Sequence, residues 1–101
     1  MDEILLTLVV PSDTARQIVD LLLEHPELVQ GFGSCEIAGH GSAVRLVAPA
    51  ELVSGHAPRV QIQTVGQAAQ LRELLDILRR SYPRANIFYW MVPALEAGRI
   101  G

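Results

Sequence analysis

Apolar residues recur along the chain with two kinds of spacing, one typical of strands and one typical of helices. The first apolar run covers residues 4–10 and stops at Pro11, while residues 59–65 alternate between polar and apolar side chains. Both patterns predict strands. A glycine-containing run over 31–38 and an aromatic run over 85–92 predict two further strands, the last of them stopped by Pro93.

The segment after the first predicted strand has the periodicity of an amphipathic helix. Apolar residues at positions 15, 18, 19, 22 and 23 lie on one side, with charged and polar residues between them. Ser12 and Asp13 precede them and are N-cap candidates. We expect the helix to end near His25, because Pro26 disfavours its continuation.

A second helical pattern over 68–82 follows the alternating strand, with Gly66 as the expected turn before it and Pro83 closing it. The predicted order is therefore β-α-β-β-α-β. Two right-handed crossovers joined by a hairpin give an α+β, ferredoxin-like sandwich, with a four-stranded antiparallel sheet and both helices on one face.

The 101 residues suffice for a single domain, residues 1–101, and its least regular part is residues 39–58. This stretch contains two of the three histidines together with several glycines and prolines, and a short apolar piece over 44–47 that could extend a hairpin into it. Loops of this length inside a compact domain are usually functional or mobile.

Composition narrows the range of functions. The net charge is −3 and the chain has no lysine, so the clustered basic face needed for nucleic acid is missing. Cys35 is the single cysteine, which rules out an internal disulfide. The acidic residues before the first apolar run do not resemble a secretory signal, and no apolar run is long enough to span a bilayer. We expect a cytoplasmic protein that is not membrane-embedded.

The strand patterns also predict an assembly. Helices on one face leave the other face of the sheet open, yet the first and last strands carry apolar side chains on both faces. We expect that face to be a subunit interface with Trp90 or Tyr89 among its anchors, because a patch of that size is unusual on a monomer. The alternative is that a loop or residues 94–101 cover it. Arg59, Gln61 and Gln63 predict a partly wet area on the same face.

The residues offer little for catalysis and somewhat more for ligand binding. No nucleophile elbow, zinc-protease motif, P-loop or dinucleotide-binding glycine motif is present. His40 and His56 bracket the long loop, and Cys35 lies on the strand before it, so these three are candidate ligands for a divalent or soft metal cation. The alternative is two solvated loop histidines and an inert thiol. Gly39-His40-Gly41-Ser42 is a glycine-rich turn of the kind that can cradle an anion, although a simple tight turn is the favoured explanation when these residues are taken alone.

Several of these residues resemble an uncharacterised bacterial family of PII-like proteins whose genes often accompany heavy-metal cation efflux systems. The resemblance spans the whole chain and is carried by Gly31-Phe32, by Gly39-His40-Gly41-Ser42 and by the sequence from Tyr89 to Pro93 running into residues 95–100.

The resemblance implies a homotrimer that binds a small ligand, a metal cation or a nucleotide, in clefts between subunits near the base of the long loop. It implies Gly39, His40, Gly41, Ser42, Glu96 and Arg99 as ligand-site residues. It also implies that the loop docks onto or releases a regulated protein, for which a membrane efflux component is one possibility.

Two features depart from better-known relatives. The glycine- and lysine-containing phosphate loop of nucleotide-binding PII proteins is not found, and the aromatic and lysine-rich segments of divalent-cation tolerance proteins are not evident. The leading hypothesis is a non-catalytic PII-like sensor, with a metal-binding or cation-tolerance protein second and a small ferredoxin-fold enzyme third.

Overall fold

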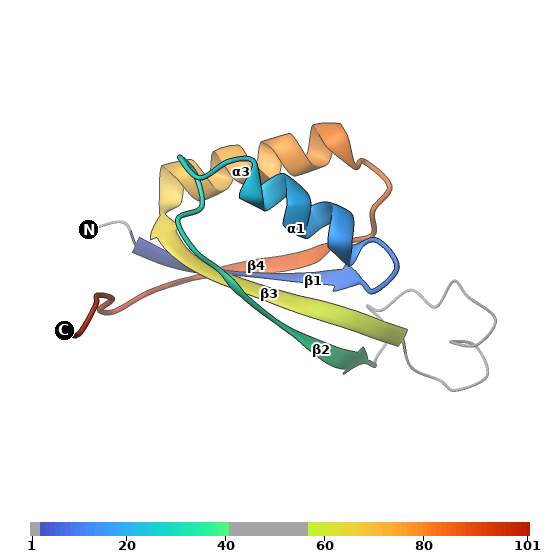
Figure 1. Ribbon diagram of the computed structural model, residues 1–101, viewed down its shortest axis with the longest axis horizontal. Helices are drawn as coiled ribbons and strands as arrows, with labels where there is room; N and C mark the ends of the chain where they lie inside the picture. Colours follow the sequence, from blue (N-terminus) through green and yellow to red (C-terminus); the bar gives the residue numbers. More distant parts are fainter. Residues whose placement is uncertain (1–2, 41–56) are drawn as a thin grey trace.

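The structure is a computed structural model that describes residues 3–40 and 57–101 (Figure 1). Within these ranges the elements follow in the predicted order. They are β1 (Glu3–Pro11), α1 (Ala15–Leu23), β2 (Gly33–Gly39), β3 (Ala57–Gln67), α3 (Ala68–Ser81) and β4 (Phe88–Pro93). The apolar piece predicted at 44–47 lies outside the described residues.

The four strands form one sheet in the order β2-β3-β1-β4, and every neighbouring pair is antiparallel. Both helices lie on the same face of this sheet, as Figure 1 shows. The predicted ferredoxin-like sandwich is therefore confirmed. None of the helices in the described ranges is long and apolar enough to cross a membrane.

The strand boundaries differ from those predicted. Gly66 is not a turn: it pairs with Ile4 inside β3, which continues to Gln67 before α3 begins. A Cβ at Gly66 would lie 3.6 Å from the Leu71 side chain, an ordinary contact, so glycine is not required there for space. The last strand begins at Phe88 rather than at residue 85, because Asn86 has a φ of 58° and breaks the extended run.

The first helix is also shorter than predicted. Thr14, rather than Ser12 or Asp13, occupies the N-cap, and its hydroxyl donates to the Pro11 carbonyl at 3.2 Å instead of accepting from the first helical turn. The helix ends at Leu23, two residues before His25.

The core lies between the two helices and the sheet face that they cover. Alternate residues of the central strand β1 are buried against both helices, as the period of two requires. The largest fully buried side chains are Leu6, Leu8, Val10, Thr7, Ile18, Leu22, Ile62, Leu71 and Leu74.

We expect Leu71→Ala to lower the free energy of unfolding by about 2–5 kcal/mol, because Leu71 is fully buried and its removal leaves a cavity. Leu23→Ala is the matched control: Leu23 is 65% exposed, and the change expected is within about 0.5 kcal/mol. Urea unfolding at one protein concentration measures both. Equal losses for the two variants would contradict this description of the core.

Candidate functional site

The sheet face without helices carries a surface divided into an apolar and a polar part. Strand register places Leu5 and Val9 of β1 beside Val92 and Phe88 of β4, with Trp90 between them. On the other side of β1, Thr7 and Val9 lie beside Gln63 and Gln61 of β3. We call this surface the open face. Its apolar part lies on β1 and β4 and includes Val65 of β3, which pairs with Leu5 and is 43% exposed, while its polar part lies on β2 and the rest of β3.

The apolar part is exposed to an unusual degree for such large side chains. Phe88 is 56% exposed, Trp90 38% and Val92 42%, and the rings of Phe88 and Trp90 lie 5.9 Å apart in a tilted arrangement. Because β4 is an edge strand of the sheet, its outer backbone edge is open as well.

Only one of the two expected aromatic anchors lies on this face. Tyr89 pairs with Leu8, which is buried under the helices, so Tyr89 shares the helix-covered side of the sheet. Trp90 pairs with Thr7 on the open side. Of the two residues predicted as interface anchors, only Trp90 therefore lies on the open face.

The polar part of the open face is held by hydrogen bonds between strands. Gln63 donates to the Thr7 hydroxyl at 3.2 Å, and the Cys35 thiol donates to Gln61 at 3.7 Å. Gln63 is exposed, as predicted for a partly wet area, whereas Arg59 is only 3% exposed. Across the described ranges, no buried side-chain nitrogen or oxygen lacks a hydrogen-bond partner.

Residues 94–101 do not cover the open face. Leu95 and Ile100 are each 103% exposed, so neither side chain packs against the sheet. This segment is joined to β1 by a bond from the Ala94 N–H to the Glu3 carbonyl at 3.1 Å.

The residues expected to bind a ligand lie at opposite ends of the sheet. Gly39 ends β2, and the exposed His40 follows it, at the end where Pro11 closes β1. Glu96 and Arg99 lie beyond β4, at the end where β1 begins. The nine residues of β1 separate these two ends by about 26 Å. One chain therefore does not bring the two groups together. Gly41 and Ser42 lie outside the described residues.

The metal-ligand prediction is only partly within the described structure. Cys35 is exposed on β2, and His40 is five positions further along, about 16 Å away at the rise of an extended strand. Among residues 3–40 and 57–101, no group of three or more histidine, cysteine or acidic side chains could hold a metal ion. His56 lies outside these ranges, so the set of Cys35, His40 and His56 stays a prediction.

A shallow cavity of about 440 Å³ lies at the base of the long loop, lined by Ser12, Glu36, Ile37, Ala38, Pro58 and Arg59. The Arg59 guanidinium donates to the Pro58 carbonyl at 3.0 Å. A buried arginine and an exposed glutamate thus face a hollow next to the predicted glycine-rich turn.

A larger cavity of about 630 Å³ lies between the end of α3 and the start of β4, lined by Leu75, Leu78, Arg79, Tyr82, Pro83, Arg84, Ala85, Asn86, Ile87 and Tyr89. We call it the α3–β4 cavity. It was not predicted from the sequence, because its residues belong to the predicted helix, to the predicted aromatic strand and to the link between them.

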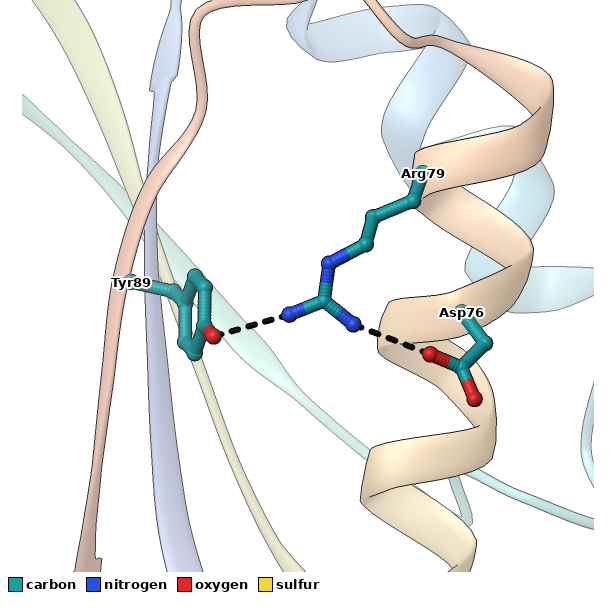
Figure 2. A network of polar contacts seen from close by, with 3 residues as sticks. All are labelled: Asp76, Arg79 and Tyr89. Atoms are coloured by element: carbon teal, nitrogen blue, oxygen red, sulfur yellow. Dashed lines mark hydrogen bonds and ion pairs between the residues drawn. The ribbon is translucent and has the colours of Figure 1, made fainter.

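One arginine of this cavity, Arg79, binds two partner residues, Asp76 and Tyr89 (Figure 2). Arg79 donates to the Asp76 carboxylate at 2.9 Å and to the Tyr89 hydroxyl at 2.8 Å, and its guanidinium carbon lies 5.7 Å from the centre of the Tyr89 ring. The interaction joins α3 to the edge strand β4.

A further charged pair, His25 and Glu27, lies outside these surfaces. The pKa of Glu27 lies below its usual value, because the carboxylate accepts a backbone hydrogen bond and, secondly, a bond of 3.1 Å from His25. This pair lies in the turn after α1, apart from the open face and from the α3–β4 cavity.

The fold and the open sheet face define a class: the chain has the architecture of PII-like and CutA proteins. The chain belongs to the DUF3240 family, described as proteins of unknown function, whose model matches residues 1–101. No curated protein matches the chain.

Solved structures agree with this assignment. A DUF3240 family protein from Shewanella baltica OS155 is 25% identical, with a TM-score of 0.78 and coverage of 100% of this chain and 99% of the other. A protein described as PII-like and signalling, from Thermus thermophilus, is 17% identical, with a TM-score of 0.61 and coverage of 91% and 88%.

The periplasmic divalent cation tolerance protein CutA from Archaeoglobus fulgidus is 13% identical, with a TM-score of 0.70 and coverage of 96% and 88%. The last two identities are low and show a shared fold. The family resemblance inferred from the sequence is thereby confirmed.

We expect Tyr89→Phe to lower the free energy of unfolding by about 0.5–1.5 kcal/mol, because it deletes the hydroxyl that Arg79 binds while keeping the ring. Tyr82→Phe makes the same deletion at the other tyrosine of the cavity and should change stability by less than about 0.5 kcal/mol. Urea unfolding at fixed protein concentration compares them. A larger loss for Tyr82→Phe would contradict the role given to the Arg79–Tyr89 bond.

Proposed function

We propose that the chain is a non-catalytic regulatory protein of the PII-like class that works as a homotrimer. It binds a small ligand, a metal cation or a nucleotide, in clefts between subunits and signals through the long loop to a partner protein. The observation that carries the proposal is the apolar part of the open face, which residues 94–101 leave uncovered.

The separation of the candidate ligand residues supports a site built from two subunits. Gly39 and His40 lie at one end of the sheet and Glu96 and Arg99 lie beyond the other. A second copy seated on the open face can supply the missing half of the site. In this arrangement the glycine-rich turn, with Gly41 and Ser42, offers backbone N–H groups, and Arg99 offers countercharge to an anionic ligand.

Signalling requires that the ligand bind one state of the loop more tightly than another, since a ligand with equal affinity for both shifts nothing. Because Gly39 and His40 continue directly into the loop, a ligand held there acts on the loop at its base. The regulated partner in this proposal is a component of metal homeostasis, such as a cation efflux system in a membrane.

A second candidate function is cation binding as such, in a metal-binding or cation-tolerance protein. It is supported by the soft and borderline donors Cys35, His40 and His56 and by the fold shared with a divalent cation tolerance protein. Cys35 lies on β2 and His40 follows the end of that strand, too far away to share an ion with Cys35 within a subunit. This function too therefore needs residues from the loop or from a neighbour.

Assembly is tested by native mass spectrometry of the wild-type protein and of Trp90→Arg. We expect a wild-type complex near three times the 11.0 kDa chain and a shift of Trp90→Arg to the monomer, because an unpaired charge is placed in the apolar part of the interface. Leu23→Arg is the control, since Leu23 is an exposed leucine on α1. A monomeric wild-type protein would overturn both the interface and the site between subunits.

Ligand binding is tested by titrating the trimer with divalent cations and with adenine nucleotides. We expect about one ligand per subunit, lost in His40→Ala while the trimer mass is retained; His25→Ala is the control, because His25 pairs with Glu27 in a surface turn. Loss of a cation signal would identify a cation site, and loss of a nucleotide signal would identify a nucleotide site. Binding that survives in His40→Ala would exclude the proposed location.

A further inference from the structure

The segment 94–101 presents two large aliphatic side chains entirely to solvent. Leu95 and Ile100 are each 103% exposed, and the acidic Glu96 lies beside Leu95. A single exposed aliphatic residue is ordinary, but two in eight residues next to a strand as apolar as β4 indicate a contact surface.

The α3–β4 cavity is complementary to this segment, because its lining contains apolar side chains and arginines. Its lining includes Ile87, which is half-buried, and Leu75 and Leu78, which are only 6% and 4% exposed. This apolar part, which we call the floor, is accompanied in the lining by Arg79 and Arg84. Since Arg79 is already bound to Asp76 and Tyr89 (Figure 2), the exposed Arg84 is the cation that remains to receive an incoming carboxylate.

Within one chain the segment and the cavity are at opposite ends of β4. The lining residues place the cavity at the end where Phe88 begins the strand. The segment leaves from Pro93 at the other end, as the course of the chain in Figure 1 shows. In this chain the cavity is open and the segment is in solvent, so any pairing of the two joins different copies.

We propose that segment 94–101 of one subunit docks in the α3–β4 cavity of a second copy of this chain. Leu95 packs on the apolar floor, and the Glu96 carboxylate accepts hydrogen bonds from the Arg84 guanidinium of that copy. The inference rests on the proposed homo-oligomer and names a contact that would hold it together.

Two features favour this occupant over an unrelated protein. The segment places a carboxylate, Glu96, beside an aliphatic residue, Leu95, and the cavity places the exposed Arg84 near the half-buried Ile87, so the two surfaces match in charge and polarity. The cavity lies with Tyr89 on the helix-covered side of the sheet, so this contact is additional to the one across the open face. The contact also joins two different surfaces, which makes it heterologous. Heterologous contacts generate rings where the rotation between copies closes, and three copies with three such contacts form a complete ring.

Disulfide trapping tests the contact directly. In a Cys35→Ser background, Arg84→Cys combined with Glu96→Cys should form bonds between chains under mild oxidation. We expect covalent dimers and trimers on a non-reducing gel, and the tryptic peptide that joins positions 84 and 96 by mass spectrometry. Gln17→Cys combined with Glu96→Cys is the matched control, because Gln17 is exposed on α1.

The outcomes separate this inference from the proposed function. A complex that keeps its oligomeric mass but forms no bond between positions 84 and 96, or forms as much with position 17, overturns the docking contact and leaves the oligomer standing. A protein that is monomeric by native mass before oxidation overturns both.

Charge reversal provides a second, independent readout. Glu96→Arg and Arg84→Glu should each raise the dissociation constant of the complex by about two- to fivefold per contact, and the double reversal should restore it, because the ion pair is rebuilt with opposite sign. Arg72→Glu, an exposed site on α3, controls for the change in net charge. A double reversal weaker than either single variant overturns the pairing.

Discussion

The packing of two helices on one face of a four-stranded sheet is the constraint on which the rest of this molecule depends. The central strand β1 contributes Leu6, Leu8 and Val10 to that contact, each at most 1% exposed, and it also pairs with both β3 and β4. Because side chains alternate along a strand, the residues that fill the core dictate which residues face outward. The apolar part of the open face is therefore fixed by the same register that forms the core.

That register explains why the open face is divided. On β4 the outward positions carry Phe88, Trp90 and Val92, whereas on β3 they carry glutamines that bond to neighbouring strands. The apolar part therefore lies at the β4 side of the open face and the hydrogen-bonded part towards β2, both kinds of surface being usual in a specific protein contact. The two edge strands of the sheet also differ in composition: β4 is rich in aromatic residues, whereas β2 consists mainly of small residues.

Sequence periodicity predicted the order of the elements and the sheet face left uncovered, because both follow from local alternation. The predictions from periodicity were wrong where the pairing of residues distant in the sequence determines the local structure. Gly66 has the composition of a turn, but its pairing with Ile4 keeps it in β3. Tyr89 belongs to an aromatic run, but its register opposite Leu8 places it under the helices, where Arg79 binds it. The α3–β4 cavity is lined by residues from a helix, a turn and an edge strand. Periodicity describes one element at a time, so it could not predict a cavity formed by three.

The candidate ligand residues extend the same argument from the fold to the site. A motif can indicate that Gly39, His40, Glu96 and Arg99 belong together, but only strand direction shows that β1 holds the two groups about 26 Å apart. The base of the loop and the α3–β4 cavity lie at one end of the sheet, on opposite edges, while residues 94–101 leave from the other end. A heterologous contact joins two different surfaces of neighbouring copies, so it can bring together residues that one chain keeps at opposite ends or edges of the sheet. The proposed ligand site therefore requires residues from more than one subunit, because one chain keeps its two groups of candidate residues at opposite ends of the sheet.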